Sequence, residues 1–399
     1  MRMKTNLLAH GFIACCLFSS FICADGFAQT VKNPFARSPI VAKRTGQLVT
    51  AELKALKDTI NLPLSQLTEE LQIVKLDNRD EALIGGWTRT TVGKKHILIS
   101  NNKQTPYKLF DRNGKFLTNI GSYGQGPNEY LNTYAEQLDE ERNRIYILPW
   151  QSDKLLVFDL KGQPQPPIPL GARVPKGQFR VDGAKSEVTV TALPFKGSAA
   201  VVWVQDFKGK RKKVVAPKHL EVPQDFSNEV LNDNNAATYN VMLAVIMPPR
   251  IDSLYHYNPT ANKLEACFTA KYPEDKIPWH DYSELPAYYQ GNVSSPIQVS
   301  KTTWVGSKPA YYMVDKKSLR GSYVRLYNDF LGTSDMTVWP LFSNGYYVLN
   351  QEPLQLQETL EKELKKKGLS AKARARAQKL FDSLNENDNN VVIFAKLKP

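Results

Sequence analysis

Short β-rich runs, separated by turn residues, follow one another through most of the sequence between residues 71 and 345. The runs are rich in Val, Ile, Tyr and Phe and have the length of single strands. Clear examples are residues 96–100, 107–110, 144–148 and 155–159. The separators carry residues that tight turns need, such as Asp111, Asn113 and Gly114. A long series of hairpins restricts the chain to an antiparallel all-β fold.

The length of this region selects one architecture among the all-β folds. Residues 71–397 are too many for one sandwich, whereas a four-stranded propeller blade takes about 40 to 50 residues. The predicted blades cover residues 72–120, 134–170, 178–217, 237–270 and 296–331, and a last one begins near residue 338. We therefore predict a six-bladed β-propeller domain over residues 60–399.

One insertion with helical periodicity interrupts the last predicted blade at about residues 354–385. Leu356, Leu360 and Leu364 recur at helical spacing, Gly368 ends the first helix, and Ser370 caps a second one. The outer face of this helical hairpin is basic. Its cations are Lys362, Lys365, Lys366, Lys367, Lys372, Arg374, Arg376 and Lys379. A solvated face and a binding face are both compatible with this pattern.

Residues 71–76 and 391–397 are matching strand candidates at the two ends of the domain. A ring of blades keeps exposed strand edges unless its two ends meet in one sheet. We therefore expect these two strands to pair in one blade and to close the ring.

The N-terminus has the pattern of a secretion signal over residues 1–28. Arg2 and Lys4 precede an apolar stretch over residues 7–23, and small residues lead to a cleavage site after Ala28. An alternative is lipidation of Cys15, because residues 12–15 resemble a bacterial lipobox. Both predict export to the periplasm or cell envelope of a Gram-negative bacterium, with membrane attachment only through that lipid. Residues 29–59 then form a polar leader with one helical turn over residues 51–57.

Export changes how the cysteines and the net charge of the chain are interpreted. Cleavage removes three of the four cysteines, so an internal disulfide is excluded. The remaining Cys267 has apolar neighbours in the sequence, and we expect it to be a buried core residue. The formal net charge of +13 becomes +12 when Arg2, Lys4 and Asp25 are lost. Outside the cytosol this charge does not indicate nucleic acid, and anionic glycans or a lipid surface are the better candidates beside simple solubility.

The usual signatures of catalysis are missing. The histidines after the signal, His96, His219, His256 and His280, do not form the zinc-protease pattern. The sequence has no nucleophile elbow and no phosphate-binding glycine loop. We therefore predict no catalytic residue, cofactor or metal. Paired carboxylates such as Glu140 and Glu141 cannot be placed from sequence, so a lyase or hydrolase acting on polysaccharide or peptide at the channel mouth is the alternative.

Aromatic residues mark the candidate ligand surface. Trp279, His280, Asp281 and Tyr282 cluster in a Pro-rich stretch that we expect to be irregular, and Trp87, Arg89 and Trp150 stand at strand ends. Rings with a few polar anchors suit sugars or peptides, although packing between blades also uses rings. The predicted function is non-catalytic binding of a glycan, a peptide or an envelope protein through one face. The oligomeric state stays open.

A glycine motif follows the first hairpins. Its members are Gly121, Gly124, Gly126, Pro127, Glu129 and Tyr130. The glycines permit positive φ, the proline stiffens the exit, and the last two side chains can bond and pack where one blade meets the next. We interpret the motif as a blade junction rather than as a ligand site.

Residues 60–85 and 110–130 together resemble the exported six-bladed β-propeller proteins of the Bacteroidetes, a family related to NHL and TolB-like propellers and largely without assigned function. The motifs cover residues 60–160, the closing strand is also similar, and residues 170–340 match by strand rhythm. The resemblance implies the propeller fold and export. Leu148, Pro149 and Trp150 stand where NHL-like repeats usually place an aspartate, so it implies no polar site there.

We expect the mature protein to begin at Gln29, because the cleavage pattern ends at Ala28. Intact-mass spectrometry of the protein secreted from its native host checks this expectation. A mature chain that begins with an acylated Cys15 would contradict it and establish the lipid anchor.

Overall fold

The computed structural model describes residues 33–86, 88–101, 104–273, 277–333 and 341–399. The chain divides into two compact units, Met1–Asn33 and Pro34–Pro399, and the elements below belong to the second unit. The predicted signal peptide over residues 1–28, its Cys15 and the candidate Trp87 lie outside the described residues and stay predictions.

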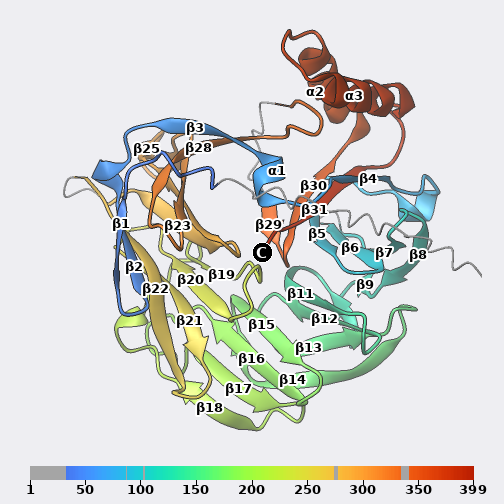
Figure 1. Ribbon diagram of the computed structural model, residues 1–399. Helices are drawn as coiled ribbons and strands as arrows, with labels where there is room; N and C mark the ends of the chain where they lie inside the picture. Colours follow the sequence, from blue (N-terminus) through green and yellow to red (C-terminus); the bar gives the residue numbers. More distant parts are fainter. Residues whose placement is uncertain (1–32, 87, 102–103, 274–276, 334–340) are drawn as a thin grey trace, which may run out of the picture. The chain divides into compact units, whose positions relative to one another are not determined.

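Six β-sheets are arranged as blades around a common axis, which confirms the predicted six-bladed propeller (Figure 1). Blade one holds β5 (Thr88–Val92), β6 (His96–Asn101), β7 (Tyr107–Asp111) and β8 (Phe116–Ile120). Blade two holds β11 (Thr133–Asp139), β12 (Arg144–Pro149), β13 (Ser152–Phe158) and β14 (Pro164–Val174). Blade three holds β15 (Gly177–Asp182), β16 (Glu187–Ala192), β17 (Val202–Asp206) and β18 (Arg211–Val215).

The other three blades include strands from the beginning of the domain. Blade four holds β19 (Glu229–Leu231), β20 (Asn240–Ala244), β21 (Ser253–Asn258) and β22 (Lys263–Lys271), with β1 (Ala42–Thr45) and β2 (Leu48–Glu52) at its outer edge. Blade five holds β23 (Trp279–Glu284), β24 (Tyr288–Ser294), β27 (Ala310–Asp315), β28 (Gly321–Tyr327) and β3 (Thr59–Pro63). Blade six holds β29 (Leu341–Ser343), β30 (Tyr346–Gln351), β31 (Val391–Lys396) and β4 (Gln72–Lys75).

The smaller elements lie in connections between the blade strands. Two-stranded sheets are formed by β9 (Ser122–Tyr123) with β10 (Glu129–Tyr130), and by β25 (Pro296–Gln298) with β26 (Trp304–Gly306). The short helices are η1 (Leu53–Ala55), α1 (Leu64–Leu67), η2 (Asp80–Ala82) and η3 (Lys218–Leu220). They fill connections and leave the sheets uninterrupted.

The predicted leader over residues 29–59 is corrected by the structure over its described part, residues 33–59. Strand β2 pairs in parallel with β22, with Val49 opposite Phe268, and β3 pairs in parallel with β28. Val49 and Ala51 are buried by these contacts. The strands are short and stand among polar residues, and their burial depends on sheets formed far along the chain, so the sequence pattern does not reveal them. Within this segment, the predicted helical turn corresponds to the 3-10 helix η1.

Three predicted blade boundaries are also wrong. The fourth blade begins with β19 at Glu229 rather than at residue 237. Residue 72 belongs to β4 and so to blade six, whereas the first blade begins at β5. The fifth blade begins at Trp279 rather than near residue 296, because the stretch expected to be irregular forms β23 and β24. Pro278 and Pro286 flank the first of these strands without interrupting it, which is where strands tolerate proline.

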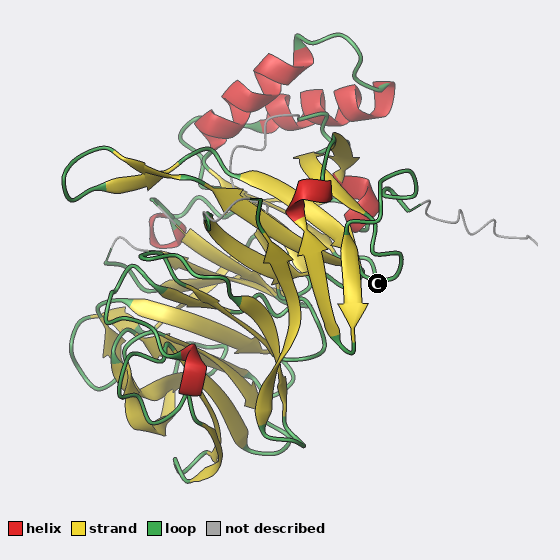
Figure 2. Ribbon diagram, turned by 90° about the vertical axis from the view of Figure 1, so that its left-hand side faces the viewer, coloured by secondary structure: helices red, strands yellow, loops and turns green. Residues whose placement is uncertain are grey.

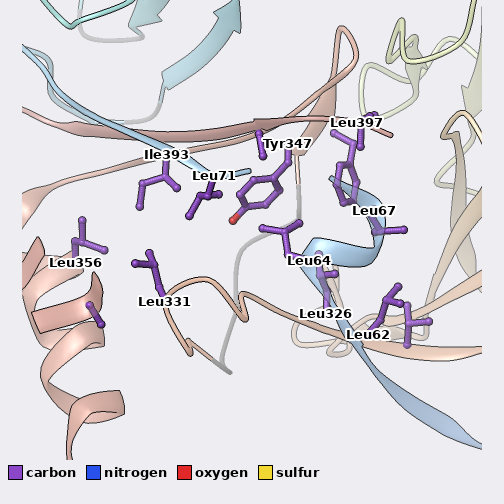
Figure 3. Packing of buried hydrophobic residues seen from close by; sticks show 14 of the residues in the cluster. Leu62, Leu64, Leu67, Leu71, Leu326, Leu331, Tyr347, Leu356, Ile393 and Leu397 are labelled. Carbon is purple, nitrogen blue, oxygen red and sulfur yellow. The ribbon is translucent and has the colours of Figure 1, made fainter. Parts of the chain in front are cut away.

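The predicted ring closure is confirmed. Strand β31 pairs on one side with β30 and on the other with β4, with Ile393 opposite Ile73. Residues 391–395 are at most 1% exposed, so both faces of β31 are buried. Figure 3 shows Ile393 and Leu397 of the C-terminal segment in one cluster with Leu64 and Leu67 of α1.

Helices α2 (Pro353–Leu364) and α3 (Ala371–Ser383) connect β30 to β31, which confirms the predicted helical insertion (Figures 1 and 2). Leu356 and Leu360 face the core cluster of blade six, and the Ser370 hydroxyl accepts a hydrogen bond from the Ala373 amide at 3.2 Å. On the basic face, Lys365 pairs with Glu361. In the part of the chain that the structure describes, no helix has the length and apolarity that crossing a bilayer requires.

We expect Phe394→Ala to lower the free energy of unfolding by about 3 to 5 kcal/mol, because it opens a cavity in the closing strand. Phe394 is fully buried, and the Arg112 guanidinium lies 4.4 Å from its ring centre. Urea unfolding measures the change. Leu117→Ala, at a side chain 43% exposed on an outer strand, is the control and should change it by less than about 0.5 kcal/mol. Equal effects of the two substitutions would contradict the closure as a stability determinant.

Candidate functional site

The propeller has two chemically different ends. Within each blade the four blade strands are antiparallel, and in blades one to five they run outward in chain order, whereas β4 from the start of the domain is outermost in blade six. The first-to-second and third-to-fourth connections therefore share one end, here called the turn end. The second-to-third connections and the links between blades lie at the other end, here called the loop end. Figure 1 shows β11, β15 and β19 near the axis and β14 and β18 at the periphery.

A cavity of about 540 Å³ lies at the turn end. Its lining comprises residues 91–94, 136–142 and 180–183 with Asn234, Asn344 and Tyr346. These residues come from the inner hairpins of five blades, so the cavity lies on the propeller axis. The lining has five carboxylates, Glu136, Asp139, Glu140, Glu141 and Asp182, against three cations, Lys94, Arg142 and Arg180.

Each carboxylate of this turn-end cavity has a partner. Glu140 accepts hydrogen bonds from the Lys94 and Lys95 amides at 2.7 and 2.8 Å and from His96 at 2.8 Å. Burial acts to raise the pKa of Glu140, but these bonds hold it below its ordinary value. The remaining pairs are Glu136 with Arg89, Asp139 with Arg142, Glu141 with Lys94, and Asp182 with Lys185.

Arg89, one of the predicted ligand residues, is part of the joint between blades one and two. Its guanidinium donates to Glu136 at 2.9 Å and to the hydroxyl groups of Tyr107 and Thr133 at 3.1 Å. Burial opposes the charge of Arg89, yet the carboxylate of Glu136 raises its pKa above the ordinary value. A guanidinium held this way has a structural role in blade packing.

The predicted aromatic site over residues 279–282 lies on β23, the first strand of blade five. The Trp279 indole donates to the Ile246 carbonyl at 2.9 Å, and the Tyr282 hydroxyl lies 2.6 Å from that of Tyr272. His280 uses Nδ1 toward the Pro278 carbonyl, and its ring centre lies 4.9 Å from that of Tyr272. Trp279, His280 and Tyr282 therefore form hydrogen bonds to blade four or to the link that leads from it. These contacts match the alternative in which the rings pack between blades.

Asp281 lies on the same strand and is partly buried. Its carboxylate accepts a hydrogen bond from the Asn292 amide at 2.7 Å. Burial raises the pKa of Asp281 to about 7, and this hydrogen bond only partly offsets the effect. The group therefore titrates near neutral pH in the folded chain.

The glycine motif joins blade one to blade two. The Tyr130 hydroxyl donates to the Ile120 carbonyl at 2.6 Å and accepts from the Tyr107 amide at 2.9 Å. Glu129 accepts from the Gly126 amide at 2.8 Å, and a Cβ at Gly124 would meet its carboxylate. Gly121 has φ +69, which glycine adopts without strain. Pro127 offers its carbonyl to Lys154 of blade two.

A polar cluster between blades four and five was not predicted. The Glu284 carboxylate bonds to His256 Nε2 and to Lys316 Nζ, both at 2.7 Å. The Cys267 thiol lies with these side chains and donates to the Leu254 carbonyl at 3.2 Å. Burial raises the pKa of this thiol, and Cys267 is buried as expected. His256, Cys267 and Glu284 offer ligand atoms within 4.8 Å of one another, a set that could hold a metal ion, although both carboxylate oxygens already have partners.

Most of the exposed large apolar side chains in the described part of the chain lie at the loop end. Among the described residues, fifteen large apolar side chains are exposed, and eleven of them lie on connections of this end. They are Leu83, Tyr123, Leu131, Trp150, Phe226, Ile251, Ile297, Val299, Trp304, Val305 and Leu354. A second cavity, of about 410 Å³, lies at the same end between Gly86 and α2.

Trp150 and Phe226 form an aromatic patch on this end. Each side chain is 45% exposed, and the two ring centres lie 6.5 Å apart. Phe226 also packs on Phe195 at 5.2 Å. The buried Lys176 ammonium fixes this link by donating to the Phe226 carbonyl at 2.6 Å and to the Asn228 carbonyl at 3.0 Å. Sequence reasoning found Trp150 but missed Phe226, which stands in a polar loop without a motif.

Asp281 gives the folded chain a measurable pH dependence. Its pKa is about 7 in the fold against 3.8 ordinarily, so the folded state binds the proton more tightly and loses stability as the pH rises from about 4 through 7. We expect Asp281→Asn to remove this loss, which amounts to about 1.4 kcal/mol for each unit of pKa difference.

Urea unfolding at pH 5 and pH 8 measures the effect. The gain of Asp281→Asn over the wild type should be larger at pH 8 than at pH 5. Asp382→Asn, on the exposed surface of α3, serves as the control for removing one carboxylate. Parallel curves for the wild type and Asp281→Asn would disprove the assignment.

Comparison with known proteins agrees with this architecture. A family model described as a domain of unknown function, DUF4934, matches residues 48–396. The crystal structure of a Bacteroides fragilis protein described as exported is similar, with a TM-score of 0.60 at 14% identity over 88% of this chain and 100% of that one. A Bacteroides vulgatus protein of the DUF4221 family has a TM-score of 0.46 at 10% identity over 83% of this chain and 97% of that one. No curated protein matches the sequence.

Proposed function

The chain belongs to the DUF4934 family, and we propose that it is an exported, non-catalytic propeller that binds a glycan, a peptide or an envelope protein through its loop end. Export is supported by the signal pattern over residues 1–28 and by the likeness to a Bacteroides protein described as exported. The periplasm or the cell envelope of a Gram-negative bacterium is the location that fits both.

The observation that carries the proposal is the one-sided distribution of exposed apolar side chains. Single exposed apolar residues are normal on a soluble protein and need no explanation. Of the fifteen such side chains that the described residues include, eleven lie on the connections of one end. Aromatic rings such as Trp150 and Phe226 supply large contact areas at low entropic cost, which is why interfaces are enriched in them.

The chemistry of the turn end makes it a less suitable binding surface than the loop end. The net charge of the chain favours an anionic partner, whereas the turn-end cavity has more carboxylates than cations in its lining. A glycosidase also needs one protonated carboxyl group as general acid. Hydrogen bonds and the Lys185 ammonium lower the pKa values of Glu140 and Asp182, which makes these two groups poor candidates for that role. The alternative of a lyase or hydrolase at the channel mouth therefore has less support.

We expect Trp150→Ser combined with Phe226→Ser to weaken binding to a glycan array, or to isolated cell envelopes of the host, by at least about tenfold, because it removes the aromatic patch. The matched control is Leu117→Ser combined with Val214→Ser, at side chains that are 43% and 41% exposed on outer strands. The control should bind like the wild type. Equal binding by both double variants, or no binding by the wild type to either probe, would refute the proposal.

A further inference from the structure

The ribbon formed by β25 and β26 is an exposed part of the loop end. It stands in the connection between β24 and β27 of blade five, and its register places Ile297 opposite Val305 and Gln298 opposite Trp304. Every residue of the two strands except Pro296 is exposed. A two-stranded ribbon of this kind is only marginally stable in water without a covering partner.

One face of the ribbon is apolar, and the other carries Trp304 beside Gln298. Ile297 and Val305 are 47% and 43% exposed on one face, and Trp304 is 39% exposed on the other. Val299, 57% exposed, follows Ile297 by two residues and extends its face. Within the described residues neither strand pairs with any sheet beyond the ribbon, so its two edges offer unpaired backbone groups. Such an edge accepts an additional extended strand.

Charge identifies the kind of partner. No acidic residue occurs between Glu284 and Asp315, whereas Lys301 stands at the tip of the ribbon and Lys308 at its base. A cationic, apolar element is complementary to an acidic surface with apolar pockets. A second copy of the exported chain, with a net charge of +12 after the predicted cleavage, lacks that complementarity.

The polar tip of the ribbon favours a protein partner over a lipid bilayer. Residues 300–303 are Ser, Lys, Thr and Thr, and all four are exposed. Inserting such a tip into lipid would place a lysine and three hydroxyl groups in hydrocarbon, which is costly. A protein groove can bind the apolar stem of the ribbon and leave the tip in water.

We propose that the β25–β26 ribbon is the docking element for an acidic protein, which adds an extended segment to the edge of the ribbon and covers its apolar side chains. This inference rests on the proposed function and narrows the partner at the loop end to an acidic protein. The aromatic patch then contributes a second, separate part of the interface.

The test starts with the full chain carrying a photo-crosslinking amino acid at Val299 in its native host, with the same substitution at Leu117 as the control. The protein crosslinked only at Val299 is then expressed and purified, and its Kd for the purified propeller is measured. We expect Ile297→Thr with Trp304→Thr, and separately Lys301→Glu with Lys308→Glu, to raise this Kd by about tenfold or more. For the wild type we expect the Kd to rise with salt concentration.

Several results would overturn the proposal. They are the absence of an adduct specific to Val299, an adduct with a second copy of the chain, and a Kd unchanged by both ribbon variants. Sedimentation with vesicles of 70% phosphatidylethanolamine and 30% phosphatidylglycerol would also overturn it if the wild type binds and the ribbon variants do not. A Kd that depends on Trp150 and Phe226 but not on the ribbon would refute this inference and leave the proposed function standing.

Discussion

The structure depends on the pairing of β31 with β4, which joins the two ends of the domain inside blade six. A propeller has no other place where the ring could open, because each remaining sheet has its four blade strands in one continuous stretch of the chain. The pairing combines backbone hydrogen bonds with burial of both faces of β31, so the same strand completes both the sheet and the hydrophobic core of blade six. Opening it would expose two strand edges together with the cluster around Tyr347.

Closure also determines what the rest of the chain can do. With β4 fixed in blade six, the preceding residues run along the outside of the ring, where β2 and β3 cover the outer edges of blades four and five. Polar groups are used at the joints between blades, as in the Arg89 network and in the cluster of Glu284 with His256 and Lys316. Such buried pairs favour one geometry of neighbouring blades over others, at a cost in desolvation.

The fold could be predicted from sequence wherever a local pattern was sufficient. Residues 391–397 are apolar on both faces and follow a turn, which identifies a central strand without knowledge of its neighbours. Strands β2 and β3 lack such a pattern because their burial comes from partners more than two hundred residues away. The candidate site was harder to predict than the fold. A tryptophan such as Trp150 stands out in the sequence, whereas Phe226 and the ribbon can be recognised as candidates only when the topology places them at the same end.

The same topology explains why the two ends differ in chemistry. Turn-end connections are short hairpins whose carboxylates are occupied in holding turns and joints, as the bonds of Glu140 show. Loop-end connections include the links between blades and the long insertions, such as α2 with α3, which can change in length without disturbing the sheets. Side chains that the closed ring does not need for packing can therefore accumulate at the loop end. The fold itself gains nothing from exposing these apolar side chains, which is the physical basis for proposing that a partner binds at this end.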